Sequence, residues 1–316
     1  MKIKLGRVVV FCLVSVVVLS LFTACAPPAE EAASSLIEVT DHAGRVVTIE
    51  RMPEKIISLA PSITEIVYAL GLEDKLVGVT QYCNYPEAAK DKPKIGGYSS
   101  VDLEKVVEIQ PDLILATRTH RAEVIPELER LGLTVLDLYP TTIDEVMEAI
   151  TLVGKCTGKE NEASQLVTEI GKRIKAVTDK TDNLPESQRP RVFYVLWHDP
   201  LKTVGSDNRI HELIELAGGT NIAQDLSGIS VTISLEAVIA ANPEVIVASS
   251  GSGIGMGADL PLQLALTEPR LKGVAARINK QVYGMDNDLI NRAGPRIADT
   301  LELLAKMIHP EIFGPP

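Results

Sequence analysis

Aromatic and charged side chains gather in the loops that follow the short apolar runs of this sequence. Those that we expect to contact a bound molecule are, first, Tyr98, Arg118, Trp197 and Asp288, and after them Tyr82, Tyr85, His198 and Arg292. Aromatic faces suit a flat, largely apolar ligand, and hydroxyl or carboxylate groups can orient its polar edge. The chemistry that these residue types indicate is capture of a small molecule.

Several of these residues also have a plainer interpretation. Trp197 is the only tryptophan of the chain, and a tryptophan that ends a strand is often half-buried core. Tyr98, His120 and His198 could each ligate a haem iron, although a lone histidine in a loop is usually solvated or capping. The two arginines could clamp carboxylates, or they could be structural ion-pair partners.

The same loops carry no signature of catalysis. The sequence contains no GxSxG nucleophile elbow, no HExxH metal site and no close carboxylate pair in these loops. The glycine-rich run at residues 251–257 has neither the P-loop lysine nor the GxGxxG spacing, so we expect it to be a cleft rim.

We predict a binding protein, not an enzyme, without a metal site or a resident cofactor. A hydrolase or metal reductase is the alternative from another class, and an adhesive or structural protein would leave these loops unexplained.

An internal repeat indicates how these loops are held. Residues 101–116 and 233–248 match position by position, both reading Φ-x-L-E-x-Φ-Φ-x-x-x-P-(D/E)-Φ-I-Φ-A, where Φ is apolar. The pattern predicts a short amphipathic helix that stops near the proline, followed by an apolar strand. Each copy is then one αβ unit, and such units build mainly parallel sheets. Each copy also carries one glutamate, Glu104 or Glu236.

The surrounding pattern predicts two α/β lobes, at residues 37–140 and 183–316. A hairpin is expected at residues 37–49, because apolar and polar residues alternate around a turn there. Residues 141–182 have apolar positions at helical spacing, which predicts one long connecting helix that residues 156–160 could bend or break. The predicted fold class is therefore α/β, with two lobes of mainly parallel sheet, one backbone helix joining them and a ligand cleft between them.

The first residues are typical of an exported chain. Residues 1–24 form a basic head and an apolar run that is shorter than the roughly 20 residues of a membrane span. Residues 21–25 resemble the bacterial lipobox, in which the cysteine is diacylated, so we expect Cys25 to carry lipid and residues 25–36 to be a tether. The alternative is an ordinary signal with an incidental cysteine.

The composition argues against nucleic acid as a partner and does not decide whether the remaining cysteines pair. The formal net charge of −11 argues against nucleic acid. Cys83 and Cys156 remain once the signal is removed and Cys25 is lipidated. Two free, buried thiols are the first expectation and a disulfide is the alternative.

Longer segments resemble a known family. KIISLAPSITEIVYALGLEDKLVGVTQYCNYP, KIGGYSSVDLEKVVEIQPDLILA, YVLWHDPLKTVGSDNRIHELIELAGGTNI and NRAGPRIADTLELL are similar to the iron-siderophore and cobalamin class of solute-binding proteins of ABC importers. The resemblance covers nearly all of residues 37–313. Within the class, YCNYP resembles the cobalamin-binding branch, with Asn84 where an aspartate is usual.

The resemblance implies a fold, a ligand and a partner. It implies two α/β lobes on one long backbone helix, and a corrinoid ligand, with haem or a ferric siderophore as alternatives. It also implies a monomer on the extracytoplasmic face of a membrane, with Glu104 and Glu236 docking onto arginines of a permease dimer. The two glutamates could instead be ordinary solvated residues retained from an ancient duplication.

Overall fold

A computed structural model describes residues 36–251 and 259–316 of the 316-residue chain. These residues belong to one compact unit, Leu36–Pro316. The predicted signal and Cys25 lie outside the described residues, and so does nearly all of the glycine-rich run.

The first lobe is built on a four-stranded parallel sheet with the strand order β4-β3-β5-β6. Its strands are β3 (Ile56–Ser58), β4 (Leu76–Val79), β5 (Leu113–Ala116) and β6 (Val135–Asp137). The predicted hairpin precedes this sheet as the antiparallel pair β1 (Ile37–Thr40) and β2 (Val46–Ile49). The helices of this lobe are α2 (Pro61–Ala69), α3 (Leu103–Ile109) and α4 (Val124–Arg130).

The second lobe repeats this plan with the strand order β10-β7-β12-β13, again parallel. Its strands are β7 (Arg191–Val195), β10 (Thr220–Asn221), β12 (Val245–Ser250) and β13 (Val282–Asp286). A small antiparallel sheet contains β8 (Trp197–His198), β9 (Leu201–Thr203) and β11 (Val231–Thr232). The helices are α7 (Arg209–Leu216), α8 (Leu235–Ala241), α9 (Leu260–Thr267), α10 (Ala275–Ile278), α11 (Asn287–Asn291), α12 (Ile297–Ile308) and α13 (Pro310–Phe313). Short 3-10 turns occur in both lobes and between them, at Glu73–Lys75, Glu87–Asp91, Arg118–His120, Glu186–Gln188 and Pro269–Gly273.

The sequence repeat forms the same αβ unit in each lobe, α3–β5 and α8–β12. The side chains of Asp102 and Ser234 cap the two helices by accepting the backbone N–H three residues on, at 3.2 and 3.1 Å. Both helices end in a left-handed residue, Gln110 at φ 51° and Asn242 at φ 45°, directly before the proline. The predicted repeat is confirmed, and matching caps at both ends hold each unit to the same length.

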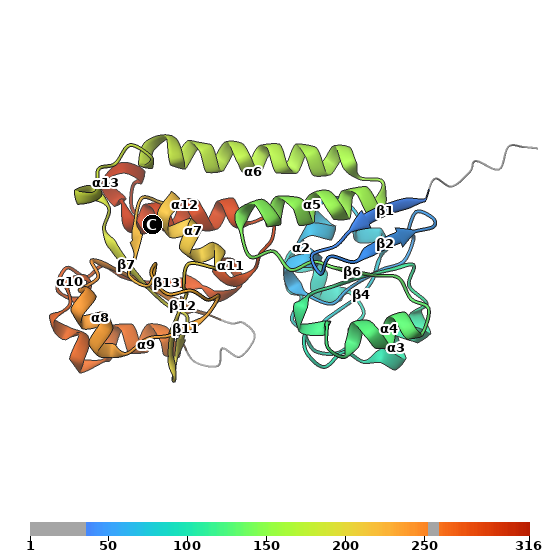
Figure 1. Ribbon diagram of the computed structural model, residues 1–316, viewed down its shortest axis with the longest axis horizontal. Helices are drawn as coiled ribbons and strands as arrows, with labels where there is room; N and C mark the ends of the chain where they lie inside the picture. Colours follow the sequence, from blue (N-terminus) through green and yellow to red (C-terminus); the bar gives the residue numbers. More distant parts are fainter. Residues whose placement is uncertain (1–35, 252–258) are drawn as a thin grey trace, which may run out of the picture. The chain divides into compact units, whose positions relative to one another are not determined.

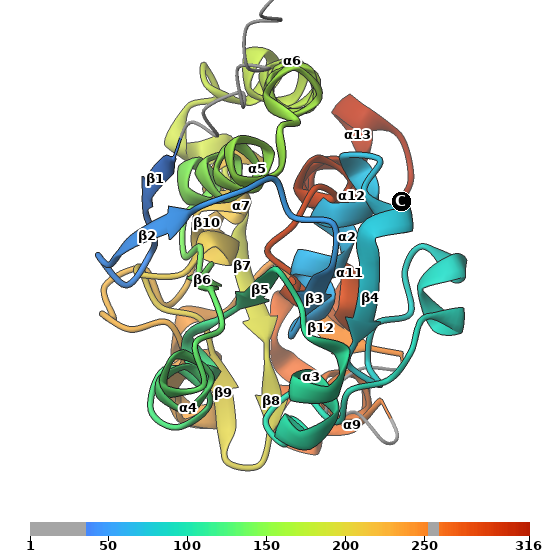
Figure 2. The same ribbon diagram turned by 90° about the vertical axis from the view of Figure 1, so that its right-hand side faces the viewer.

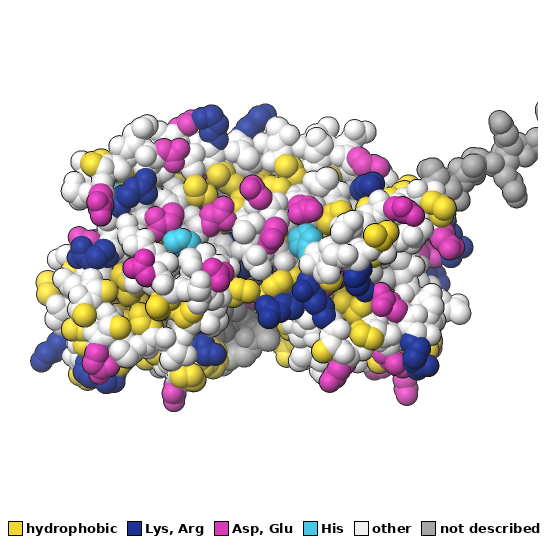
Figure 3. Space-filling view, viewed as in Figure 1, with side chains coloured by type: hydrophobic (Ala, Val, Ile, Leu, Met, Phe, Trp, Pro, Cys, Tyr) yellow, Lys and Arg dark blue, Asp and Glu magenta, His cyan; other side chains and the backbone are white. Residues whose placement is uncertain are grey.

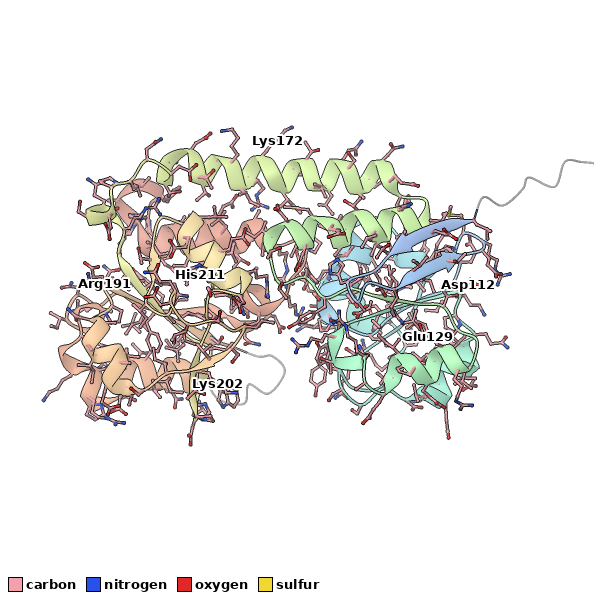
Figure 4. All side chains as sticks on the ribbon, in the orientation of Figure 1. Asp112, Glu129, Lys172, Arg191, Lys202 and His211 are labelled. Atoms are coloured by element: carbon pink, nitrogen blue, oxygen red, sulfur yellow. The ribbon has the colours of Figure 1, made fainter. Side chains whose placement is uncertain are left out.

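The acidic residue after each proline ties its strand to a neighbouring one. Asp112 accepts the backbone N–H of Lys55 at 2.9 Å, just before β3. Glu244 in the same way accepts the backbone N–H of Arg191 at 3.0 Å, at the start of β7. Figure 4 labels Asp112 and Arg191 in their separate lobes. The D/E position of the repeat is therefore a structural latch at the amino end of each sheet.

The connecting helix predicted at residues 141–182 is two helices, so a single unbroken helix is wrong, and the break lies within residues 156–160 as the sequence allowed. α5 (Ile143–Thr157) begins with a capping box between Thr142 and Glu145, and α6 (Glu160–Thr181) follows after Gly158 at φ 68°. A Cβ at Gly154 would lie 2.6 Å from the Cβ of Ala163, so glycine permits the close approach of the two helices. Figures 1 and 2 show α5 and α6 lying side by side. The long backbone helix that joins the lobes is α6 alone.

Helix α6 contacts the second lobe along α12 and the first lobe through α5. On the α12 side, Arg173 donates to Glu302 at 2.7 and 2.8 Å and also binds Asp299. Lys172, next to it in the chain, points away from the body of the molecule (Figure 4). None of the described helices has both the length and the apolarity needed to cross a membrane.

The hydrophobic core extends through both lobes and joins them into the one compact unit. Each lobe has a cluster of its own on one side of its sheet, and a larger cluster continues from Val39 in the first lobe to Ile308 in the second. Ile150 of α5 and Ile170 of α6 belong to this larger cluster. This shared core favours a stiff pair of lobes over a freely hinged one.

Candidate ligand cleft

A cavity of about 290 Å³ lies between the two lobes and receives residues from both. We call it the main cavity; its lining is Ala60, Pro61, Ser62 and Tyr98 from the first lobe and Leu196, Trp197, Asn287, Asp288, Asn291 and Arg292 from the second. Most of these residues follow the carboxyl ends of β3, β7 and β13 directly. The cavity therefore lies where ligands bind in open parallel sheets.

A second cavity of about 100 Å³ shares Ser62, Tyr98 and Asn291 with the main cavity. We call it the side cavity; it is also lined by Thr117, Leu138, Tyr139, Pro140, Thr141, Asn208, Arg209, Ile229 and Ala293. The two cavities together form the cleft. Figure 3 shows basic side chains gathered at the edge of the first lobe that faces the second.

Half of the predicted ligand contacts line the main cavity. These are Tyr98, Trp197, Asp288 and Arg292. The other four line neither cavity, and they are Arg118, Tyr82, Tyr85 and His198.

Tyr98 and Trp197 bring one aromatic ring to the main cavity from each lobe. The Tyr98 hydroxyl accepts a hydrogen bond from the Thr119 hydroxyl at 3.2 Å, and burial raises the pKa of its phenol. The Trp197 indole N–H donates to the carbonyl of Asp199 at 2.9 Å, which fixes its ring at the start of β8, just after β7. Trp197 is half-buried and lines the cavity, so its ring borders the space between the lobes.

The histidines are not placed to ligate a metal from the cleft. His120 is fully buried, with its Nδ1 accepting the N–H of Thr117 at 3.1 Å and its Nε2 2.7 Å from the Tyr98 carbonyl oxygen. Both ring nitrogens are thereby used, and burial lowers the pKa of His120 so that the ring stays neutral. These contacts support the capping role of His120 over the alternative of an iron ligand. His198 is half-buried beside Trp197, with 4.9 Å between ring centroids.

Asp288 and Arg292 belong to an ion-pair network that joins the lobes. Asp288 accepts from the Arg292 guanidinium at 2.7 Å and from the Asn84 amide of the first lobe at 2.8 Å. Arg292 also donates to Glu65 of α2 at 2.9 Å, and Arg296 donates to both Glu65 oxygens at 2.7 and 2.8 Å. The guanidinium of Arg292 is thus already neutralised by two carboxylates, which supports its structural alternative over a clamp for ligand carboxylates.

Sequence reasoning missed Glu65, although a signal for it exists. Glu65 is 3% exposed and lies in helix α2 among buried residues such as Ile63 and Val67. A carboxylate on the buried face of an apolar helix requires a cationic partner. That requirement could have indicated a pair with Arg292 or Arg296, but it does not by itself name the partner.

The segment that resembles the cobalamin branch lies beside this network. The carbonyl of Tyr82 accepts from Arg292 at 3.3 Å, and the Arg296 guanidinium lies 4.0 Å from the centre of the Tyr85 ring. Tyr85 is 47% exposed. The two tyrosines therefore lie at the margin of the cleft and not in its wall. Cys83, between them, is a free, buried thiol, as is Cys156, which confirms the expectation of unpaired cysteines.

Glu104 and Glu236 occupy the same position on the first turns of α3 and α8, and both are exposed. Glu236 lies 3.9 Å from Arg270, a weak and solvated contact. Three residues on, Val107 and Ile239 are 41% and 40% exposed, which places an apolar side chain beside each glutamate. Figure 1 shows both helices on the side of their lobes that lies away from α6.

Two lobes of parallel sheet with a lined cavity beyond the strand ends are an arrangement suited to holding a small solute. The family described as periplasmic binding protein matches residues 56–289, and the chain belongs to it. A relative in Bacillus subtilis (strain 168), named uncharacterized ABC transporter substrate-binding lipoprotein YvrC, is 34% identical over 284 residues, or 88% of this chain and 87% of the relative. A cobalamin-binding protein of Halobacterium salinarum is 30% identical over 290 residues, or 89% of this chain and 76% of the relative.

A solved structure gives the same class. The periplasmic heme binding protein of Pseudomonas aeruginosa matches with a TM-score of 0.72 and 26% identity, covering 82% of this chain and 94% of that chain. The family consists of substrate-binding proteins of ABC importers. The chain is therefore a binding protein and not an enzyme, which overturns the hydrolase or metal-reductase alternative.

Proposed function

We propose that this protein captures a corrinoid outside the cytoplasmic membrane and delivers it to the permease of an ABC importer. The observation that carries the proposal is the pair of rings, Tyr98 and Trp197, that reach one cavity from opposite lobes. A corrin is a broad ring with apolar faces and an amide edge, so two aromatic side chains suit its faces. Asn287 and Asn291, which also line the cavity, suit its amides.

The ligand class rests on two further observations. The tyrosine segment that resembles the cobalamin branch lies against Arg292 and Arg296 at the cleft. The relative in Halobacterium salinarum is named as cobalamin-binding. Haem is the second candidate, because Tyr98 lines the main cavity and a tyrosine can ligate haem iron. A ferric siderophore is the third candidate ligand of the class.

Delivery is assigned to the two glutamates of the repeat. A permease dimer with two-fold symmetry offers the same contact twice, and Glu104 and Glu236 are the matching surface carboxylates, one from each lobe. Val107 and Ile239 would add a small apolar contact beside each ion pair. The same proposal places the protein as a monomer on the outer face of a membrane, held by lipid on Cys25 through the tether at residues 25–36.

Binding is tested on the chain from residue 26, which retains the whole compact unit. Cyanocobalamin, haemin and a ferric hydroxamate are titrated separately, and binding is followed by calorimetry and by the fluorescence of Trp197. We expect cyanocobalamin to bind at micromolar concentration or below. If haemin or the hydroxamate binds and cyanocobalamin does not, the corrinoid assignment is wrong while the transport assignment stands.

A further inference from the structure

One guanidinium in the cleft is buried without a counter-ion among the described residues. Arg209, the first residue of α7, is 9% exposed and lines the side cavity. Its Nη2 donates to the carbonyl oxygen of Ile290 at 3.1 Å, while its Nε has no hydrogen-bond partner among the described residues. No carboxylate of the described chain lies within ion-pair distance of it, in contrast to Arg292 and Arg296.

Such a charge is costly to hold in the folded protein. An isolated buried ion loses its hydration and regains little from neutral neighbours. Burial lowers the pKa of Arg209 to about 10, so the guanidinium is still a cation at neutral pH. The donors of this side chain are therefore charged and incompletely used.

The charges around the side cavity favour an anion there. Arg118, though exposed, lies with its guanidinium 5.4 Å from the centre of the Tyr139 ring, and Tyr139 lines the same cavity as Arg209. The cleft carboxylates Glu65 and Asp288 are already bound to Arg292 and Arg296. The charge left uncompensated at this side of the cleft is positive, and it lies next to neutral hydrogen-bonding side chains such as Thr141 and Asn208.

We propose that Arg209 binds an oxyanion of the captured molecule, a phosphate or a carboxylate, in the side cavity while the rest of the ligand occupies the main cavity. The two cavities share Ser62, Tyr98 and Asn291, so one molecule can occupy both. The proposal rests on the proposed capture of a ligand in this cleft. A corrinoid would supply its nucleotide phosphate, and haem would supply its propionates.

The first test uses inorganic phosphate alone, because it does not depend on the identity of the ligand. Thermal unfolding of the chain from residue 26 is compared for the wild type, Arg209→Gln, Arg209→Lys and the control Arg189→Gln. Arg189 also donates to backbone carbonyls, of Thr181, Leu184 and Glu215, but lines neither cavity. We expect phosphate to raise the Tm of the wild type and of Arg189→Gln, to raise that of Arg209→Lys less, and to leave Arg209→Gln unchanged.

The second test uses ligand pairs that differ in the oxyanion. Cyanocobalamin is compared with dicyanocobinamide, which lacks the nucleotide phosphate, and haemin with its dimethyl ester. For the pair that the wild type binds, we expect Arg209→Gln to weaken the affinity for the member with the oxyanion about tenfold to a hundredfold and to leave the affinity for the other member unchanged. Without ligand, Arg209→Gln should unfold at the same or a higher temperature, because an uncompensated buried charge is gone.

The outcomes separate this inference from the proposed function. The inference is overturned if phosphate stabilises the wild type no more than Arg209→Gln. It is also overturned if both members of a pair weaken equally while the ligand-free Tm falls, since Arg209 would then be structural. If the wild type binds no corrinoid or porphyrin, the proposed ligand classes fail, and the phosphate test still decides on Arg209.

Discussion

Arg292 of the second lobe donates a hydrogen bond to Glu65 of the first lobe across 2.9 Å, at a point where both side chains are almost fully buried. Arg296 binds the same carboxylate, so a single acidic residue holds two cations from the opposite lobe. The contact adjoins the main cavity, because Arg292 also lines it. These ion pairs therefore form a buried contact between the lobes beside the main cavity, and their loss should affect both stability and ligand binding.

We expect Glu65→Gln to destabilise the protein by about 3 kcal/mol, since it removes the carboxylate bound by Arg296 and one of the two bound by Arg292. Urea unfolding of the ligand-free protein measures this loss. Glu127→Gln is the matched control, because it breaks an exposed pair with Arg130 on one helix and should leave the free energy of unfolding almost unchanged. Equal effects of the two variants would show that the ion pairs of Glu65 contribute no more to stability than a surface pair.

The double variant Glu104→Ala with Glu236→Ala should abolish uptake and leave ligand affinity unchanged, because both residues are exposed and neither lines the cleft. Uptake of labelled ligand by cells and calorimetry on the purified protein give the two readouts. Glu108→Ala removes another exposed glutamate of α3 and should retain uptake. A loss of ligand affinity in the double variant would place the glutamates in the fold or the site instead of the docking surface.

Substitutions of the two rings should separate the candidate ligands. Trp197→Leu should weaken the binding of a flat ligand up to about tenfold through the loss of ring contact, and Trp197→Phe should weaken this binding less. Tyr98→Phe should weaken a corrinoid by less than about tenfold, because only a neutral hydroxyl is lost. If the ligand is haem, the same change should remove the absorption band of an iron–phenolate bond, so the visible spectrum of the complex decides.

His120 should make stability depend on pH below about its ordinary pKa of 6.5. Burial lowers the pKa of His120 in the folded chain, so the unfolded chain binds the proton first as the pH falls. This contribution to stability is full above pH 6.5 and is lost toward lower pH, with a slope of at most about 1.4 kcal/mol per pH unit.

The variant His120→Gln, which can still donate and accept, should therefore flatten the dependence of urea unfolding on pH between about 6.5 and 5. His211→Gln, on a half-exposed residue of α7, is the matched histidine variant with which the change in slope is compared (Figure 4). An unchanged slope in His120→Gln would mean that folding does not lower the pKa of His120.

Local signals in the sequence predicted much of this architecture. The repeat at residues 101–116 and 233–248 predicted two equivalent αβ units, because capping side chains, an apolar helix face and a proline act within a few residues of one another. The same kind of signal predicted the hairpin of β1 and β2 and the parallel sheets. Ligand candidates such as Tyr98 and Trp197 followed from these elements, since the carboxyl ends of parallel strands meet at one edge of the sheet.

Tertiary structure decided what depends on partners distant in the chain. The break at Gly158 was visible as an option, but the packing of Gly154 on Ala163 is what lets α5 and α6 fold back on each other. In the same way, only the folded chain commits Arg292 to Glu65, buries His120 and leaves Arg209 without an acidic neighbour in the described part of the chain. The type of a residue indicates which kind of partner it needs when it is buried. Whether the fold supplies that partner depends on long-range packing, because burial and charge pairing are properties of the assembled lobes and not of a local stretch of chain.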